Sequence, residues 1–370
     1  MPHRGVEIQK LKIAITSGCC LACRHCGVDK SLGARVSLPA ARAGVRALLA
    51  SPGAGKRLEL YGGEPFMEFG LMRDIVRYAR ARARSAGKAL SVSVASNGLL
   101  LDRERLEFLR DNAINLSISF SGRADTHNHT RVFGDGRGSF SAVAARLPLL
   151  FSVLDRRDVV ALDCVHPANA GRAAADFKAL ARRGFRVINV ECVHGPAWPR
   201  AALEAFKADL AEICAFVEEK IAAGVFIYPE PLLELARASA APDASLNCPF
   251  YRDLELYPDG SYAFYPFAFI DYARDIEKVR IGKAARGFDG RYASCRAGSA
   301  ACRGCVSSYY RLPGLSDGSF AYRAREAAFR RLFSGVLKRA RKPGPWRDYA
   351  AGVFSLLERN YASGVALARK

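Results

Sequence analysis

The sequence predicts an α/β protein in which six parallel strands alternate with helices, followed by a smaller cysteine-rich part with a β-hairpin and by C-terminal helices. Three observations lead to this prediction. Short β-rich runs alternate with helical patterns from residue 10 to about residue 225, the alternation stops beyond residue 240, and cysteines cluster once in each part. The 370 residues, half of them hydrophobic, suffice for one large domain and a smaller one.

Six βα units make up the first part. The helix after the sixth strand carries apolar residues at steps of three and four, which places them on one face. These residues are Phe206, Leu210, Ile213, Val217 and Ile221. The predicted strands are Lys12–Thr16, Leu58–Tyr61, Ser91–Ala95, Asn115–Phe120, Val159–Val165 and Val187–Val193. The predicted helices between them are Leu38–Leu49, Phe69–Ser85, Asp102–Arg110, Ser139–Leu150 and Ala173–Arg183.

Three cysteines follow the first strand on one short loop. Cys19, Cys23 and Cys26 have the spacing C-x3-C-x2-C, and Cys20 falls outside it. Three thiolates this close can hold three irons of a [4Fe-4S] cluster and leave the fourth iron open. A zinc site usually takes four ligands in two C-x2-C-like pairs, and disulfide frameworks belong to short secreted chains, so both alternatives fit less well.

A glycine-rich motif, Gly62-Gly63-Glu64-Pro65, closes the second apolar run. Glycines let the backbone approach a ligand closely, and Glu64 supplies a carboxylate for an ammonium group. This motif alone is a weak signal. Together with the cysteine loop, in this order and each at the end of a strand, it is a strong one.

With these two motifs the chain resembles the radical S-adenosylmethionine (radical SAM) superfamily, whose signature is CxxxCxxC after the first strand of a βα barrel. The resemblance implies a partial (β/α)6, TIM-like barrel with ligands at the C-terminal ends of the strands. It implies a [4Fe-4S] cluster held by Cys19, Cys23 and Cys26, with S-adenosyl-L-methionine (SAM) as the second cofactor. Gly62, Gly63 and Glu64 would hold the amine of SAM, and His25 would lie near its adenine.

The segments after the third and fourth strands extend this resemblance. Asn97, in Asn97-Gly98, looks like an element that lies near SAM in relatives, although a plain turn explains this pair equally well. Residues 117–140 resemble the SxDG...H...R...G.GSF region of the sulfatase-maturase-like, SPASM-containing branch. There, the residues matching Ser119 and Arg131 approach the ribose and the carboxylate of SAM. The aspartate that precedes the glycine in that branch is absent from this chain.

Two further patterns are weaker. His127 and His129 form an HxH pair, but no additional metal ligands are evident nearby. The stretch Gly53-Ala54-Gly55-Lys56 lacks the Ser or Thr and the upstream glycine that a phosphate-binding P-loop needs.

The second part contains another cysteine set around a predicted hairpin at Pro258-Asp259-Gly260. Its order resembles the SPASM/twitch extension, which implies one auxiliary [4Fe-4S] cluster; a tetrahedral zinc ion at the same cysteines is the alternative. The implied ligands are Cys248, Cys295, Cys302 and Cys305. Cys164, Cys192 and Cys214 lie in predicted strands and a helix, and are expected to be buried structural residues.

We therefore expect a radical SAM barrel over residues 1–235, a SPASM/twitch-like domain over 236–320 and a C-terminal helical segment over 321–370. The helical patterns of the last segment break at Lys342-Pro343-Gly344-Pro345. Whether this segment packs over the barrel mouth or binds a partner remains open at this point.

The formal net charge is +20, from 56 Lys and Arg against 36 Asp and Glu. The basic residues are scattered through alanine-rich helices without interleaved aromatic residues, which favours a solvated surface over a DNA-binding one. The densest basic stretch, Arg323 to Lys370, would suit an acidic substrate or redox partner. No signal-peptide core and no apolar run of membrane-spanning length is present, so we expect a cytoplasmic protein without membrane association.

The resemblance implies reductive cleavage of SAM to a 5'-deoxyadenosyl radical that abstracts hydrogen from a substrate. The branch mostly modifies peptides or proteins by oxidation, crosslinking or epimerisation, so we expect a peptide or protein substrate. The alternatives are a small-molecule dehydrogenase or a cofactor or natural-product biosynthesis enzyme, and a non-catalytic iron-sulfur scaffold. Reduced flavodoxin or ferredoxin would be the electron donor.

Overall fold

The computed structural model describes residues 8–193, 196–240, 253–263, 276–277, 279–289 and 318–361. Its centre is one sheet with the strand order β11-β10-β9-β8-β1-β2-β3-β4-β5-β6-β7. All pairs from β8 to β7 are parallel, and β9, β10 and β11 continue the sheet with antiparallel pairs. The strands are β1 Lys10–Thr16, β2 Gly55–Gly62, β3 Ala89–Ser96, β4 Ile114–Ile118, β5 Val159–Val165, β6 Val187–Cys192, β7 Tyr228–Pro229, β8 Asp253–Leu256, β9 Ser261–Ala263, β10 Arg280–Lys283 and β11 Gly287–Phe288. The predicted α/β class with a parallel core is confirmed.

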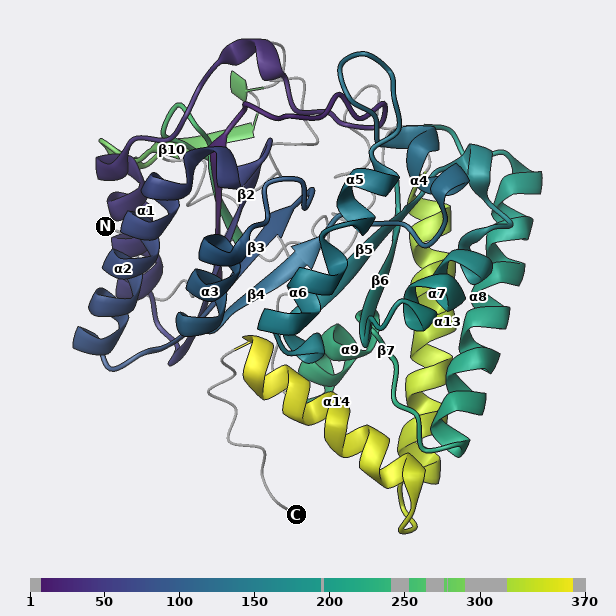
Figure 1. The fold of residues 1–370 in the computed structure, drawn as a ribbon. Helices are drawn as coiled ribbons and strands as arrows, with labels where there is room; N and C mark the ends of the chain where they lie inside the picture. The colour runs from purple at the N-terminus through teal and green to yellow at the C-terminus, as the bar shows by residue number, and fades with distance from the viewer. Residues whose placement is uncertain are drawn as a thin grey trace.

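Helices connect successive parallel strands and cover the outer face of the sheet, with α1, α2 and α3 on the left of Figure 1 and α7 and α8 on the right. The helices are α1 Leu38–Ala50, α2 Phe69–Ser85, α3 Arg103–Asp111, α4 Ala124–Thr130, α5 Phe140–Ala144, α6 Leu147–Val153, α7 Ala173–Arg182, α8 Arg200–Ala222, α9 Pro231–Ala240, α13 Gly318–Arg339 and α14 Pro345–Tyr361. Side-chain caps fix several starts. The Ser37 hydroxyl accepts from the Ala40 N–H before α1, and the Asp102 carboxylate accepts from the Arg105 N–H before α3.

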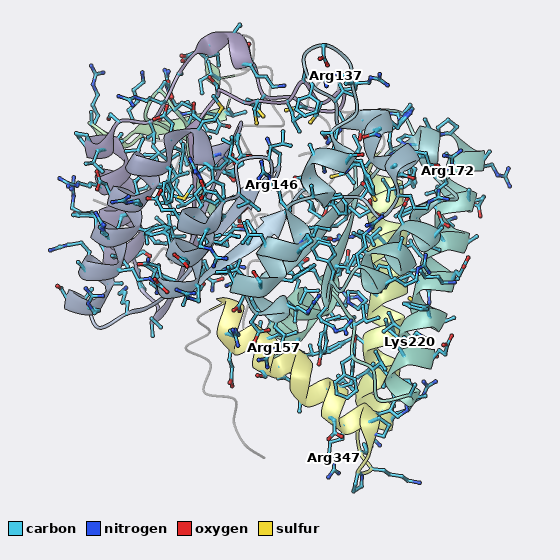
Figure 2. All side chains as sticks on the ribbon, viewed as in Figure 1. Arg137, Arg146, Arg157, Arg172, Lys220 and Arg347 are labelled. Atoms are coloured by element: carbon cyan, nitrogen blue, oxygen red, sulfur yellow. The ribbon has the colours of Figure 1, made fainter. Side chains whose placement is uncertain are left out.

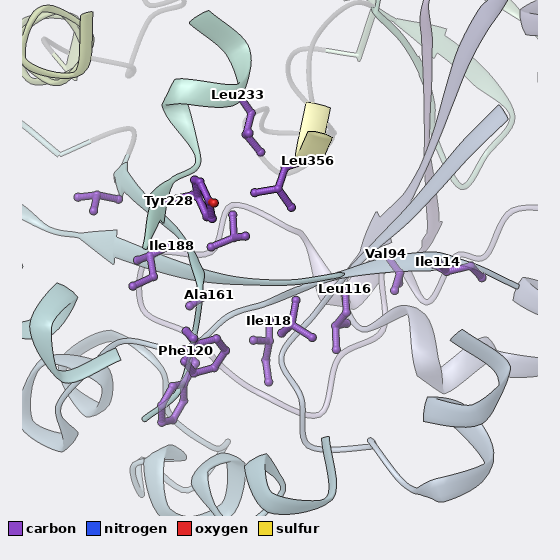
Figure 3. Packing of buried hydrophobic residues seen from close by; sticks show 14 of the residues in the cluster. Val94, Ile114, Leu116, Ile118, Phe120, Ala161, Ile188, Tyr228, Leu233 and Leu356 are labelled. Carbon is purple, nitrogen blue, oxygen red and sulfur yellow. The ribbon is translucent and has the colours of Figure 1, made fainter. Parts of the chain in front are cut away.

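Basic side chains cover the surface, as the exposed Arg146, directly before α6, and Arg172, directly before α7, illustrate (Figure 2). The core lies on both sides of the strands. Leu233 of α9 and Leu356 of α14 pack on one side, and Ile118 and Phe120 lie on the other (Figure 3). Within the described part of the chain, no helix has the length and apolar character needed to span a bilayer.

Of the two C-terminal helices, α14 lies at the N-terminal end of β5, and α13 runs beside α8 and β6 (Figure 1). The predicted break is confirmed, because α13 ends at Arg339 and α14 begins at Pro345. From α14, Arg359 forms an ion pair with Asp158, which directly precedes β5. From α13, the buried Arg325 donates to the Asn189 side chain of β6 at 2.7 Å. Helix α14 is therefore held at the N-terminal end of β5, whereas α13 is held against the length of β6.

The structure differs from the sequence prediction at several places, among them helices α4 and α9, which the sequence did not predict. The helix expected over Ser139–Leu150 is divided into α5 and α6, because Pro148 lacks the N–H that a continuous helix needs and is tolerated only in the first turn of α6. The two-residue strand β7 is too short to give a pattern. The predicted hairpin forms as β8 and β9, but β8 also pairs in parallel with β1, which local sequence does not indicate.

A buried charge network joins β8, β1 and β2. Lys12 lies opposite Glu59 on β2 and opposite Glu255 on β8, and its Nζ is 3.6 Å from a carboxylate oxygen of each. The Tyr61 hydroxyl donates to Glu255 at 2.5 Å. Burial raises the pKa of Glu255 to about 7 against the opposing effect of Lys12. One lysine thus compensates carboxylates from both neighbouring strands.

Replacing Lys12 by Met should destabilise the protein by about 3 kcal/mol, because removing one partner of a buried ion pair leaves an uncompensated charge. Urea unfolding followed by circular dichroism measures this loss. In the control variant Lys207→Met, a largely solvated pair with Glu204 is lost, and the change should stay within about 0.5 kcal/mol. Equal effects in the two variants would show that the network does not stabilise the sheet.

Candidate functional site

The cysteine loop follows β1 at the C-terminal edge of the sheet. Its backbone is fixed to the segment after α4, because the Ala22 N–H donates to the Val132 carbonyl and the Arg24 N–H to the Thr130 carbonyl, both at 2.7 Å. Lys30 Nζ donates to the Leu21 carbonyl at 2.6 Å. The loop is therefore held from two sides, independently of any bound group.

The loop thiols are accessible and unpaired. Cys26 is exposed, Cys19 and Cys23 are half-buried, and none forms a disulfide. Asn97 Nδ2 donates to Cys20 Sγ at 3.3 Å and to Cys19 Sγ at 3.6 Å. A hydrogen bond from the Cys20 thiol lowers the pKa of Cys19 to about 6, which favours the thiolate that binds metals.

The glycine motif crosses directly over the start of this loop. The Gly63 N–H donates to the Thr16 carbonyl at 2.7 Å, and the Glu64 N–H donates to the Gly18 carbonyl at 2.8 Å. A Cβ atom at residue 63 would lie 2.0 Å from the Gly18 oxygen, and Gly62 has φ +132°. Close contact between two backbone segments therefore requires glycine at both positions.

Glu64 is completely buried and connects the ends of β2 and β3. Its carboxylate accepts from the Asn97 N–H at 2.8 Å, the Ser96 hydroxyl at 2.9 Å and the Phe66 N–H at 3.1 Å. Burial raises the pKa of Glu64 to about 7 despite these donors. Its predicted contact with the SAM amine stays a prediction.

Arg131 is a buried cation beside the cysteine loop. Only 5% of the residue is exposed, Nη2 donates to Cys164 Sγ at 3.1 Å, and Nε has no hydrogen-bond partner among the described residues. His25 Nδ1 is also buried without a partner in this part of the chain. Burial, reinforced by Arg131, lowers the pKa of His25 to about 3, so the ring is neutral.

The structure places the remaining predicted residues as follows. Asn97 lies beside the cysteine sulfurs, and Ser119 follows the end of β4, where its N–H donates to the Ser96 carbonyl at 2.8 Å. The four predicted auxiliary ligands, Cys248, Cys295, Cys302 and Cys305, lie outside the described residues.

Sequence reasoning missed the roles of Cys20, Ser96 and Cys164. Cys164, expected to be a structural residue, receives the hydrogen bond of Arg131. The two-residue alternation of β5 already placed it on the face opposite Val165, but the sequence does not show what faces it.

The two weaker patterns are structural. His127 is buried, with Nε2 3.0 Å from the Ser139 hydroxyl and Nδ1 accepting from the Ser121 N–H at 3.3 Å. Gly55 and Lys56 belong to strand β2, and Lys56 Nζ donates to the Ile8 carbonyl at 2.6 Å. No three His, Cys, Asp or Glu side chains within the described ranges converge on a position for a single metal ion.

Taken together, the fold and the site define a parallel α/β protein with a three-cysteine loop and a glycine motif at adjacent strand ends. Residues 13–159 match the model of the Radical SAM superfamily, and this part of the chain is a radical SAM domain. The predicted relationship to this superfamily is confirmed.

Comparison with individual proteins agrees with this assignment. The chain is 27% identical over 205 residues to a serine-type anaerobic sulfatase-maturating enzyme of Klebsiella aerogenes, covering 51% of this chain and 48% of that protein. It therefore spans about half the length of this curated relative.

Two solved structures share the fold. The structure of polyhistidine-tagged anSMEcpe with bound AdoMet has a TM-score of 0.71 at 17% identity, covering 95% of this chain and 98% of that chain. Streptococcus suis SuiB bound to its precursor peptide SuiA has a TM-score of 0.54 at 11% identity, covering 79% of this chain and 67% of that chain.

Next to Cys164, Asp163 is buried between β5 and the outer helices. Burial, reinforced by the nearby Asp176 carboxylate, raises the pKa of Asp163 to about 7. The folded protein thus holds this carboxyl protonated at pH values where the unfolded chain releases the proton. Its contribution to stability is full below about pH 4 and is lost as the pH rises towards 7.

Asp163→Asn should therefore raise the melting temperature more at pH 8 than at pH 4.5, because asparagine keeps the neutral form at both pH values. Thermal unfolding at the two pH values measures the difference. In the control variant Asp111→Asn, on the exposed end of α3, the two shifts should be equal. A gain at pH 8 no larger than at pH 4.5 contradicts the assignment of a protonated Asp163.

Proposed function

We propose that this chain is a radical SAM enzyme that acts on a peptide or protein. The observation that carries the proposal is the three-cysteine loop, held at the strand ends beside the buried Arg131. Cys19, Cys23 and Cys26 would hold a [4Fe-4S] cluster. With SAM bound, these cofactors would supply a 5'-deoxyadenosyl radical by reductive cleavage of SAM. The protein would bind and orient the substrate and exclude water from the site.

The loop fits such a cluster better than a single metal ion. In a [4Fe-4S] cluster each thiolate binds a different iron, so the sulfurs need not converge on one point. The hydrogen bonds of the loop backbone to Thr130 and Val132 would hold its shape when the cluster is reduced.

Arg131, His25 and Asn97 fit the groups of SAM. A buried guanidinium without a carboxylate partner in the described structure is costly, and an anion such as the SAM carboxylate would compensate it. The neutral His25 ring offers an aromatic face rather than a second positive charge. Ser119 lies at the neighbouring strand end, where a ribose hydroxyl could bind.

The proposed substrate class is supported by what similar proteins bind or act on. One solved relative of this fold is anSMEcpe with bound AdoMet and Cp18Cys peptide, and another is SuiB with its precursor peptide. The curated relative is a sulfatase-maturating enzyme. We propose the same class of substrate here, with reduced flavodoxin or ferredoxin as the electron donor and one auxiliary [4Fe-4S] cluster at Cys248, Cys295, Cys302 and Cys305.

Anaerobically reconstituted protein should contain about eight irons per chain, two clusters of four by the cysteine count. The triple variant Cys19→Ala, Cys23→Ala and Cys26→Ala should lose about half of this iron and all 5'-deoxyadenosine formation with dithionite and SAM. Iron analysis and chromatography of the products measure both quantities.

Two results would contradict this assignment. Wild-type protein that binds SAM but forms no 5'-deoxyadenosine would be a scaffold rather than an enzyme. About four irons per chain, with zinc retained, would eliminate the auxiliary cluster.

Arg131→Met should weaken SAM binding by about 1.5–3 kcal/mol, the range for a hydrogen bond to a charged group. The melting temperature without SAM should stay equal or rise, because the change removes a buried charge that has no ion-pair partner in the described structure. Calorimetric titration and thermal unfolding separate the two effects.

The control for this variant is Arg137→Met. Arg137 is exposed and, like Arg131, follows α4, and its replacement should change neither the SAM affinity nor the melting temperature. Unchanged SAM affinity in Arg131→Met would remove Arg131 from the proposed site.

A further inference from the structure

A groove crosses the outer face of the molecule between α5 and α6 on one side and α7 on the other. It consists of two adjoining cavities of about 450 and 480 Å³ that share Arg183 in their lining. We call this feature the arginine groove, because Arg123, Arg156 and Arg182 also line it. Among the described residues, no carboxylate lines either cavity.

The arginine groove has an unbalanced positive charge. Arg123 is compensated by Asp176, at 3.2 Å, and by Asp125. Arg156, Arg182 and Arg183 are exposed, and no ion pair to any of them occurs within the described residues. Three cations therefore lie along the groove without a counter-ion from the described part of the chain.

Two of these guanidinium groups rest on aromatic rings. Arg183 Cζ lies 5.0 Å from the centre of the Phe140 ring, and Arg156 Cζ lies 4.2 Å from that of Phe151. One N–H of each donates to a backbone carbonyl, that of Gly122 and that of Gly184 respectively. Each planar group is thus held in place while its other N–H donors can bind a carboxylate.

The walls between the arginines are apolar. Phe140 lines the first cavity, and Leu147, Pro148 and Phe151 line the second. A small inorganic anion would use the cations but not these walls. A chain that alternates carboxylates with apolar side chains would use both.

One end of the arginine groove lies at the start of α4, the helix whose last residue, Thr130, binds the cysteine loop. Its rim includes Gly122, between β4 and α4, and Ala124, the first residue of α4. Helix α4 then leads to Thr130 and Val132, whose carbonyls bind the cysteine loop. A chain lying in the groove would thus extend towards the strand ends where the proposed chemistry takes place.

We propose that the arginine groove binds an acidic, partly apolar stretch of the peptide or protein substrate, outside the residue that is modified. This inference rests on the proposed substrate class. It assigns the recognition of the substrate to the barrel's own outer helices.

The test compares two double variants of the full chain. Arg182→Gln with Arg183→Gln removes two groove cations, and Arg82→Gln with Arg84→Gln removes two arginines from the last turn of α2. The probe is a fluorescein-labelled synthetic peptide of alternating Glu and Leu, and fluorescence anisotropy measures its affinity at low and at high NaCl concentration.

We expect about a tenfold loss of peptide affinity in the groove variant, the size of one charge-assisted contact, and no loss in the α2 variant. High salt should weaken wild-type binding strongly and that of the groove variant less. The single variant Arg182→Gln, at a side chain without a ring contact in the described structure, should show part of the loss even if the double variant unfolds.

Three results would overturn the proposal. Equal binding of the peptide in which Lys replaces Glu would exclude charge recognition. Displacement of the peptide by millimolar inorganic phosphate would show a small-anion site instead. The third result is unchanged peptide affinity in the groove variant, with 5'-deoxyadenosine formation lost only when flavodoxin replaces dithionite. It would show that the groove binds the electron donor instead.

Formation of 5'-deoxyadenosine with dithionite should be equal in all these variants. The experiments can therefore refute the proposed peptide binding without refuting the proposed radical SAM activity, and the reverse.

Discussion

The candidate site depends on one contact between two backbone segments. Residues 62–64, at the end of β2, cross over residues 16–18, at the end of β1, with the Gly63 and Glu64 N–H groups bound to the Thr16 and Gly18 carbonyls. The crossing is so close that a single Cβ atom at residue 63 would break it. It fixes where the cysteine loop leaves the sheet, and through Glu64 it also fixes the end of β3. Three neighbouring strand ends thus share one rigid frame.

Around this frame the electrostatics are asymmetric. The loop carries thiols, of which Cys19 favours the thiolate, and the neutral imidazole of His25, and the buried guanidinium of Arg131 lies beside the loop. Among the described residues no carboxylate pairs with Arg131. The positive charge of Arg131 therefore lacks a counter-charge until an anion enters the site. Binding sites commonly contain such uncompensated charges, which lower the stability of the free protein but favour ligand binding.

The sequence was informative where function depends on local spacing. The cysteine loop, the glycine motif and most strand and helix bounds could be predicted because each depends on residues close together in the chain. The pairing of β8 with β1, the contact of Arg131 with Cys164 and that of Arg325 with Asn189 could not, since each joins residues far apart in the chain and leaves no periodic signal. The glycines of the Gly62-Gly63 motif show a further limit of prediction from sequence. Their positions were predicted, but the partner that requires them, the Gly18 carbonyl, appears only in the folded chain.

The parallel pairing of β8 with β1 also bears on how the chain folds during synthesis. Strand β1 leaves the ribosome long before residues 253–256, which in the described structure cover one of its two edges. Until then, a strand with unpaired N–H and carbonyl groups stays open to other chains. Lys10 and Lys12 of that strand would protect it in this interval. An unpaired strand edge that carries Lys side chains repels the same edge of a second chain. The same side chains that later bind the carboxylates of β8 would thus protect the nascent barrel from association before β8 exists.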